Sequence, residues 1–305
     1  MSTMTRLVGL LLLSAAAASA NAQQACDRAC LTGYVDSWFD GLAAGSTRGI
    51  ELARDARITV NNREASLADT FWNGAGDAGY RWDIVNEYLG DTGTEAAVTN
   101  ADGSKTWVAL RLKVASGQIT ELELIRANQG DADGLWGDDL HEVSPDLLLT
   151  IREADQDSYY QLIAAAEGYW RAFQTNGSEL YHPADLLPDS ERYENGMQTT
   201  GLVRGGRYVS TSEGFDQGRF SERNLWDRRY PVVDTERGIV MSIVRFGLKD
   251  GAESLSAATT SNRLVAEFFS VKHGLIKQIH AVLFNVDDSE PSAWPADYGP
   301  PRGGW

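Results

Sequence analysis

The sequence is poor in the residues that build metal and redox centres. Its 305 residues include only two cysteines and four histidines, and the histidines are scattered along the chain. A zinc site needs three or four Cys, His or carboxylate ligands at short spacings. We therefore expect no metal site.

Sequence motifs of the common cofactor-binding and nucleophile-bearing classes are also missing. The glycine-rich stretch at 74–79 lacks the preceding strand and following helix that a dinucleotide-binding fingerprint requires. The chain has no G-x-S-x-G elbow, no Walker loop and no H-E-x-x-H motif. Any catalysis would rest on side chains alone, so we expect no cofactor.

Positive charge is scarce as well. The chain has 27 Lys and Arg against 43 Asp and Glu, which gives a formal net charge of −16 at pH 7. An acidic surface repels phosphate backbones and no basic patch stands out, so no nucleic-acid partner is expected. With 43% hydrophobic and 10% aromatic residues, the composition is typical of a folded globular protein.

Long apolar runs are confined to the N-terminus. Arg6 precedes the apolar run 7–13, and Ala-Asn-Ala at 20–22 is a small-residue cleavage signal. This pattern predicts a secretory signal peptide over residues 1–22, cut before Gln23, and a periplasmic or secreted product. No later apolar run approaches the ~20 residues that a membrane-spanning helix needs, so we expect no membrane insertion.

The two cysteines, Cys26 and Cys30, lie four residues apart at the entrance to the first predicted helix. An exported protein can carry a disulfide. At this spacing, however, the geometry within a regular helix is poor, so a bridge needs a distorted first turn. The sequence leaves open whether the pair is bridged.

The sequence does contain an internal repeat, in which a helical pattern and a β-hairpin pattern occur once in each half. Apolar residues recur at helical spacing over 31–42 and again over 159–173. Each half ends in two alternating runs around an X-Gly pair, Ser116-Gly117 and His273-Gly274, which is typical of a two-residue β-hairpin. The second copy is longer by about 26 residues, which we assign to the polar, glycine-rich stretch 201–224.

These features resemble the NTF2-like (SnoaL-like) superfamily, and in particular secreted bacterial and fungal proteins that carry two such units in tandem. The resemblance rests on the helix that begins at Cys30-Leu31, on RYENGMQTT at 192–200, on WDRRYPVVDTERGIV at 226–240 and on the terminal hairpin and tail. It covers most of the mature chain, although only the second half carries distinctive motifs.

The resemblance implies an α+β fold of two tandem cone-shaped units, each with helices packed into a curled antiparallel sheet around an apolar pocket. We place unit 1 at 23–130, a linker and helical lead-in at 131–157, unit 2 at 158–288 and a Pro/Gly-rich tail at 289–305. The superfamily includes cofactor-independent isomerases, cyclases, dehydratases and hydrolases, and also non-catalytic binders. One branch, the diarylpropane lyases, deformylates lignin-derived aromatic dimers.

The hairpin register predicts the catalytic groups. Counting outward from the second turn places Glu267 opposite His280 on an apolar face, and the same face of the first hairpin carries Glu123. A buried carboxylate–imidazole pair can act as a general base, and a carboxyl group with its pKa raised by burial can donate a proton. We therefore predict His280, Glu267 and Glu123 as catalytic.

A second interpretation of the same face stays open. It could be where the two sheets pack together, with Glu267 and His280 as a structural cross-strand pair and Glu123 bonded to a residue of the other half. A one-residue slip in register would also reverse every face.

Other polar and aromatic residues are candidates for the same site. Tyr193, beside the Asn195-Gly196 turn, is the fourth predicted catalytic residue, as a proton or hydrogen-bond donor. Trp72 and Trp82 flank the glycine-rich loop and could form the rim of an aromatic-binding pocket. Arg245 could hold a carboxylate or phenolate, and His182 could line the entrance.

Together with these residues, the resemblance therefore implies a cofactor-independent lyase, dehydratase or isomerase that acts on a hydrophobic, aromatic small molecule of the lignin-dimer type. The alternative is a secreted binding or interaction module that holds a ligand without turnover. Because a duplicated unit can imitate a dimer interface within one chain, both a monomer and a homodimer remain open.

Overall fold

The structure is a computed structural model that describes residues 26–249, 262–287 and 292–294. The predicted signal peptide, its cleavage site and most of the predicted tail lie outside these ranges. Among the described residues, no helix has both the length and the apolar character needed to cross a membrane.

The first half of the chain forms one long helix and a six-stranded sheet, called sheet A here, in the order β2-β1-β6-β5-β4-β3. Its elements are α1 (Arg28–Ala44), β1 (Leu52–Val60), β2 (Arg63–Glu64), the short 3-10 helix η1 (Leu67–Thr70), β3 (Ala75–Asn86), β4 (Asp91–Asn100), β5 (Lys105–Ala115) and β6 (Gln118–Ala127).

The second half repeats this order strand for strand in sheet B, which reads β8-β7-β14-β13-β12-β11 from the corresponding edge. Its elements are α2 (Pro145–Leu148), the 3-10 helix η2 (Glu153–Asp155), α3 (Tyr159–Thr175), β7 (Leu186–Glu194), β8 (Met197–Thr200), β11 (Arg223–Asp234), β12 (Ile239–Leu248), β13 (Asn262–Lys272) and β14 (Leu275–Val286).

Three short elements of the second half have no counterpart in sheet A. They are β9 (Leu202–Arg204) and β10 (Arg207–Val209), which pair only with each other, and α4 (Glu213–Asp216). All three fall within 201–224, the stretch to which the additional residues were assigned. With two six-stranded sheets and few helices, the protein is richer in strands than the expected α+β description implies.

The two long helices begin at polar caps and bury one apolar face. The Asp27 side chain accepts a hydrogen bond from the Cys30 amide at the start of α1, and Gly45 ends that helix in the left-handed conformation. Ser158 and Gln161 form a capping box at the start of α3.

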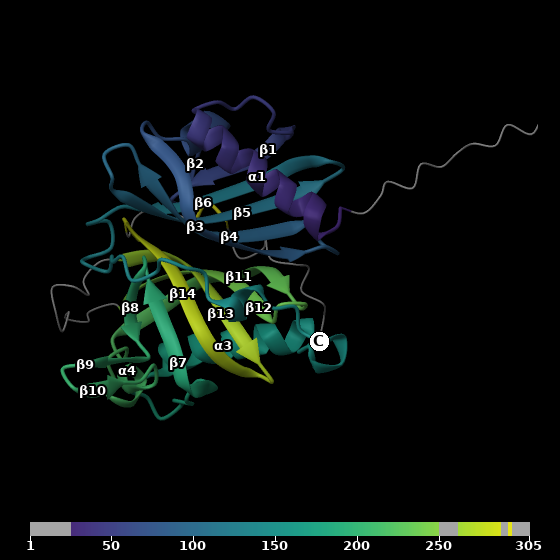
Figure 1. The fold of residues 1–305 in the computed structure, drawn as a ribbon. Helices are drawn as coiled ribbons and strands as arrows, with labels where there is room; N and C mark the ends of the chain where they lie inside the picture. Colours follow the sequence, from purple (N-terminus) through teal and green to yellow (C-terminus); the bar gives the residue numbers. More distant parts are fainter. Residues whose placement is uncertain (1–25, 250–261, 288–291, 295–305) are drawn as a thin grey trace, which may run out of the picture.

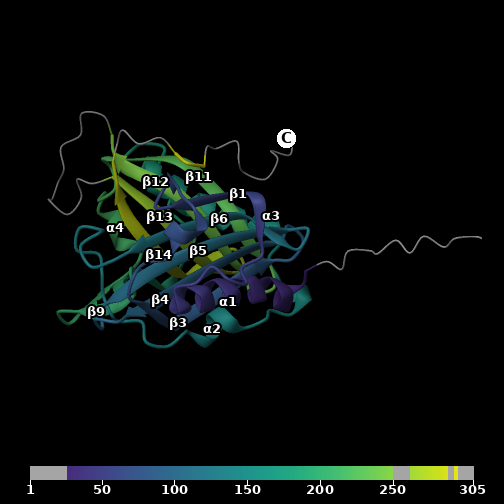
Figure 2. The ribbon, with the colours of Figure 1, turned by 90° about the horizontal axis from the view of Figure 1, so that it is seen from above.

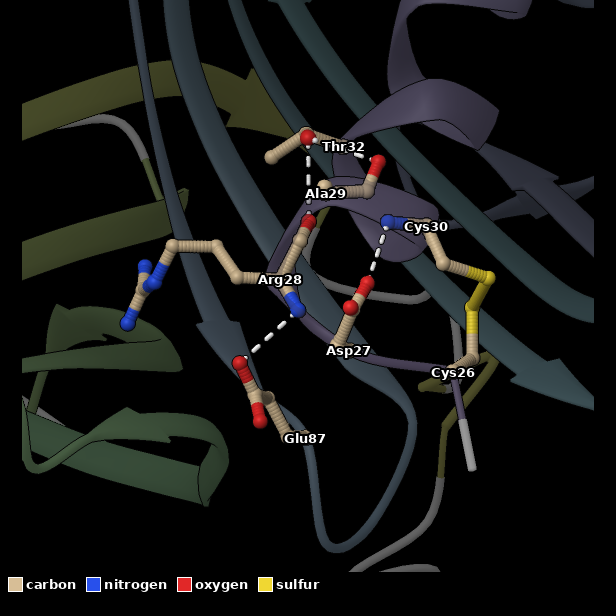
Figure 3. Close-up of a disulfide and its surroundings, with 7 residues drawn as sticks. All are labelled: Cys26, Asp27, Arg28, Ala29, Cys30, Thr32 and Glu87. Atoms are coloured by element: carbon tan, nitrogen blue, oxygen red, sulfur yellow. Dashed lines mark hydrogen bonds between the residues drawn. A yellow bond between two sulfur atoms is a disulfide. The ribbon is translucent and has the colours of Figure 1, made fainter. Parts of the chain in front are cut away.

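Cys26 and Cys30 form a disulfide across the first turn of α1 (Figure 3). Cys26 precedes the Asp27 cap and therefore lies outside the helix, where the backbone is free to bring the two sulfurs together. The poor disulfide geometry expected within a regular helix therefore does not apply. The sequence left open whether the two cysteines are bridged, and the bridge forms because the helix begins after Cys26.

The molecule has four layers in the order α1, sheet A, sheet B, α3 (Figures 1 and 2). One apolar cluster lies between α1 and sheet A, and a second lies between α3 and sheet B. A third, the central cluster, lies between the two sheets, on the face of each sheet that points away from its own long helix. Its largest members include Trp82, Trp107, Phe268, Ile243 and Met241.

Both hairpin turns form as predicted, but the register beyond them does not. Ser116-Gly117 and His273-Gly274 each have two consecutive positive φ angles, as a type I′ turn requires. Three residues after each glycine, at Thr120 and at Lys277, one extra residue bulges out of the ladder. The predicted pairing is therefore wrong by one residue, and the faces are reversed beyond each bulge.

Trp294, the last described residue, places a buried side chain against strand β1 of sheet A. Trp294 is 1% exposed, and its Nε1 donates to the Thr59 hydroxyl at 2.8 Å. The guanidinium groups of Arg57, Arg111 and Arg229 lie 4.6, 5.5 and 5.7 Å from its ring. Trp294 therefore bonds a strand of sheet A while contacting an arginine of sheet B.

Trp294→Ala is expected to lower the free energy of unfolding by about 3–5 kcal/mol, because it leaves a cavity and removes the ring from three arginines. Trp294→Phe keeps an aromatic ring and should cost less. Leu180→Ala, at a side chain that is 80% exposed, is the control and should change stability by under about 0.5 kcal/mol. Chemical denaturation measures all three, and equal midpoints for wild type and Trp294→Ala would contradict this role.

Candidate functional site

A histidine and a glutamate from the two sheets meet inside the central cluster. His280 lies on β14 and Glu95 on β4, and His280 Nδ1 is 2.9 Å from Glu95 Oε2. Their side chains are 2% and 0% exposed. The bond therefore links sheet B to sheet A in a water-poor environment, where electrostatic interactions are strong.

The surroundings of Glu95 fix the orientation of the imidazole. The same oxygen, Oε2, accepts a hydrogen bond from Trp82 Nε1 at 2.8 Å and one from the Tyr80 hydroxyl at 3.3 Å. Because Oε2 accepts in both of these bonds, we assign the donor role in the third to His280 Nδ1. In the neutral imidazole, Nε2 is then the unprotonated nitrogen.

Nε2 is the ring nitrogen of His280 that makes no bond to Glu95. It is buried and has no hydrogen-bond partner among the described residues. A buried polar atom without a partner is costly and calls for an explanation, such as a catalytic role or a bound ligand. An unprotonated imidazole nitrogen backed by a carboxylate is the standard form of a general base.

Aromatic rings hold the imidazole from two sides. Tyr193, which is opposite His280 in the β7–β14 register, stacks on it with centroids 4.9 Å apart and planes 27° apart. Trp82 contacts it edge-on with centroids 5.6 Å apart. These contacts leave the imidazole little freedom to rotate away from Glu95.

His280 and Tyr193 line a cavity of about 450 Å³. Strands β7 and β14 form one wall, and the segment 139–144 that connects the two halves forms the other. The lining residues are Asp139, Leu140, His141, Glu142, Ser144, Glu191, Tyr193, Gln278 and His280.

The polar groups at this cavity include two hydrogen-bond donors. Gln278 Nε2 donates to Glu191 at 3.0 Å, and the Tyr193 hydroxyl donates to the same carboxylate at 3.3 Å. Burial, together with the Glu191 charge, raises the pKa of Tyr193 above its usual value. The phenol therefore keeps its proton at neutral pH and can share it in a hydrogen bond.

A larger hollow of about 620 Å³ lies elsewhere between the two halves, lined in part by Arg28, Tyr88 and Tyr160. Its main charged groups are already paired with one another. Arg28 binds Asp234 and Glu236, each at 2.8 Å. His280, whose Nε2 has no partner among the described residues, lines the smaller cavity, so we assign the candidate chemistry there.

The structure separates the predicted Glu267–His280 pair. The extra residue at Lys277 makes Glu267 pair with Ala281 and His280 with Phe268, so the two side chains point to opposite faces of sheet B. Glu267 faces α3, where its Oε1 is 3.3 Å from Arg192 Nε. The predicted pairing is wrong, and the carboxylate that meets His280 is Glu95 of the other sheet.

Glu123 also has a partner that the predicted proton-donor role did not include. Arg229 binds it with two parallel hydrogen bonds of 2.7 and 3.0 Å, and both side chains are buried. Glu123 and Arg229 come from opposite halves of the chain. The open alternative, in which this face packs the sheets together and Glu123 bonds the other half, describes the observed contact.

The predicted rim and binding residues are spread over the molecule, and none of them lines the His280 cavity. Trp82 does contact the imidazole, but Trp72 lies by the cluster on the α1 side and donates to Asn100 at 2.8 Å. Arg245 is 3.8 Å from Asp227. His182 is exposed in a loop.

Sequence reasoning missed Glu95, Glu191, Gln278 and the 139–144 wall. Glu95 stands in the strand sequence DTGTEAAV among small and apolar residues, and a lone glutamate in such a run was an available signal. Its partner, however, is 185 positions away in the other sheet, which no local pattern reveals.

Within the described ranges, no group of three or more His, Cys, Asp or Glu side chains is arranged to hold a metal ion. The residues that line the cavity offer proton transfer and hydrogen bonding by His280, Tyr193 and Gln278.

Comparisons with known proteins give a family match and several structural likenesses. A family model described as a domain of unknown function, DUF8021, matches residues 155–283. No curated protein matches the sequence.

Among solved structures, an epoxide hydrolase of the LEH-like type from M. tuberculosis is 18% identical with a TM-score of 0.28, over 41% of this chain and 83% of its own. A candidate ketosteroid isomerase from Kribbella flavida is 13% identical with a TM-score of 0.30, over 44% and 84%. AclR, a candidate hydroxylase from Streptomyces galilaeus, is 12% identical with a TM-score of 0.28, over 42% of this chain and 81% of its own. At these TM-scores the structural likenesses support no conclusion about function. The argument for function rests on the site itself.

The Glu267 environment predicts how stability varies with pH. Complete burial raises the pKa of Glu267 from 4.5 to about 7, and the nearby Arg192 only partly opposes this. Between these two pH values the folded state keeps a proton that the unfolded chain releases. The stabilisation is therefore complete below about pH 4.5 and is lost as pH rises through about 7, by up to roughly 3 kcal/mol.

Glu267→Gln removes this titration, so its free energy of unfolding should fall less than that of wild type between pH 4.5 and 7. Denaturant titrations at several pH values measure the difference, and Glu153→Gln at an exposed position is the control. Parallel pH profiles for wild type and Glu267→Gln would show that Glu267 ionises normally.

Proposed function

We propose that this protein is a cofactor-independent acid–base enzyme of the lyase, dehydratase or isomerase type, acting on a small molecule with an aromatic group. The observation that carries the proposal is the buried Glu95–His280 pair, whose remaining nitrogen has no partner among the described residues and whose imidazole lines a cavity. We further propose that the two halves are tandem NTF2-like units, and that the protein is exported, as its disulfide and the sequence at 1–22 favour.

In the proposed reaction, His280 Nε2 removes a proton from a carbon atom of the substrate. The imidazolium that forms is stabilised by the Glu95 carboxylate, which is already oriented toward Nδ1. The electron pair of the broken C–H bond moves into the substrate, onto an oxygen or toward a leaving group. The Tyr193 hydroxyl and the Gln278 amide are the groups able to donate hydrogen bonds to the developing negative charge.

The proton is then returned by the imidazolium. Delivery to a second carbon gives isomerisation, and delivery to a leaving oxygen gives elimination. Each outcome conserves atoms and charge and returns His280 to its starting form. No external oxidant or reductant is needed for either.

The size and lining of the cavity support an aromatic substrate. About 450 Å³ lies within the range of small-molecule sites. The Tyr193 ring and the Leu140 side chain line the cavity, and Trp82 lies behind the imidazole. Such surfaces favour planar rings of the kind found in lignin-derived dimers.

A neutral aromatic probe tests the general base directly. Nitrobenzisoxazole opens to a coloured nitrophenolate when a base removes its ring proton. His280→Ala is expected to lower the rate by ~10²-fold or more. Glu95→Gln should also lower it, because a neutral amide at this position no longer stabilises the imidazolium. His182→Ala removes an exposed histidine away from the cavity and should leave the rate unchanged.

Thermal unfolding of each variant separates loss of activity from loss of folding. Equal rates for folded His280→Ala and wild type would remove His280 from the mechanism. Saturable binding of aromatic probes without any turnover would instead favour the secreted binding module, the second function considered for this sequence.

A further inference from the structure

The larger hollow between the two halves carries exposed aromatic side chains that the proposed reaction does not use. We call it the tyrosine hollow; its volume is about 620 Å³, and it shares no lining residue with the His280 cavity. Tyr88 and Tyr160, which line it, are 95% and 77% exposed. Large exposed side chains that gather at one hollow are typical of a binding surface.

The shape of the tyrosine hollow suits a rigid, non-polar ring. Tyr88 and Leu89 come from the turn after β3, and Tyr159 and Tyr160 are the first residues of α3. The rings of Tyr159 and Tyr160 have centroids 5.5 Å apart and are nearly perpendicular, at 84°. Two perpendicular rings form a notch with flat walls, and aromatic-lined grooves of this kind bind proline-rich segments.

The sequence that follows Trp294 has the composition that such grooves bind. It reads PADYGPPRGGW over residues 295–305, with three prolines in eleven residues, two of them consecutive at 300–301. Consecutive prolines favour the extended polyproline II conformation, which leaves the backbone carbonyls and the flat proline rings open to a partner. Because proline has little conformational freedom to lose, ordering such a segment on a groove costs little entropy.

Trp294 fixes the start of this segment in the neighbourhood of the tyrosine hollow. Its ring lies 5.5 Å from the Arg111 guanidinium, and Arg111 is 3.0 Å from Asp91. Lys113 binds Asp91 at 3.1 Å and the carbonyl of Leu89, which lines the hollow, at 3.3 Å. Eleven residues in polyproline II conformation span about 34 Å, which exceeds this path of neighbouring side chains.

The charge of the segment also matches the rim of the hollow. Arg302 is the only Lys or Arg in 295–305. Glu87 is exposed and the Glu236 side chain is 47% exposed, and both line the hollow. Each already binds Arg28, but a carboxylate can accept further hydrogen bonds. Since exposed ion pairs contribute little free energy, Arg302 would orient the segment while the prolines supply most of the affinity.

We propose that the tyrosine hollow is the docking site of the chain's own segment 295–305, with prolines 300–301 packed against the two tyrosines of α3 and Arg302 directed toward the acidic rim. The bound segment covers the exposed rings and bridges turns that belong to the two halves. This inference does not depend on the proposed function, because the hollow and the His280 cavity have no residue in common.

Competition between the tethered segment and a free peptide tests the proposal in the full-length chain. The probe is a fluorescein-labelled peptide of sequence 295–305, and its binding is measured by fluorescence anisotropy. In the wild-type chain the tethered segment competes at a millimolar effective concentration. The double substitution Pro300→Ser and Pro301→Ser weakens that competitor, so this variant should bind the peptide at least about tenfold more tightly than wild type. Pro183→Ser, in an exposed loop, is the control and should behave as wild type.

Further substitutions in the double variant locate the binding site. Tyr160→Ala is expected to weaken peptide binding by at least about fivefold, because it removes one wall of the notch. Tyr208→Ala changes a 44% exposed tyrosine on β10 that does not line the hollow, and it should leave the affinity unchanged. Thermal unfolding of each variant confirms that it is folded. A peptide that carries serine in place of both prolines should bind at least about tenfold more weakly.

Three outcomes would overturn the inference. The first is an equal peptide affinity, or no peptide binding, in the wild-type chain and the double variant. The second is peptide binding that Tyr160→Ala leaves intact or that Tyr208→Ala weakens as much. The third is dimerisation of the double variant without peptide binding, which would assign the hollow to a second copy of the chain. Sedimentation velocity distinguishes this last case.

Discussion

The buried contact between the two sheets, through the faces that point away from their own helices, is the constraint on which the rest of the structure depends. Each sheet already packs one face on its own long helix, so the central cluster covers the faces that a single unit would leave to water. Polar groups caught in this layer must find partners across it, because an unpaired buried charge is costly. Glu123 forms an ion pair with Arg229, and Glu95 forms a hydrogen bond with His280.

The same constraint explains why one of these pairs can be reactive and the other structural. Arg229 holds Glu123 with two hydrogen bonds, and a guanidinium group has only donors and no acceptor nitrogen. An imidazole can gain or lose its second proton, and only one of its nitrogens is used by Glu95. His280 also lies where the 139–144 segment and β7 enclose a cavity, so the layer that stabilises the protein also positions a base at a binding site.

The features that were predicted correctly from the sequence are local. Helical periodicity located α1 and α3, the Ser-Gly and His-Gly pairs located both turns, and the length difference located β9, β10 and α4. The face assignments failed because the bulges at Thr120 and Lys277 leave no mark in an alternating pattern. His280 and Tyr193 were found as separate candidates and are neighbours, whereas Glu95 required knowledge of how the sheets pack.

The protonation of the two ring nitrogens of His280 tests the central claim most directly. Nitrogen NMR of the labelled protein, at a pH where the imidazole is neutral, distinguishes a protonated from an unprotonated ring nitrogen, and His280→Ala identifies the signals. We expect the proton on Nδ1, hydrogen-bonded to Glu95, and a bare Nε2 able to accept a proton from a substrate. A proton on Nε2 with a bare Nδ1 would contradict the account, because His280 could then serve neither as the partner of Glu95 nor as the proposed base.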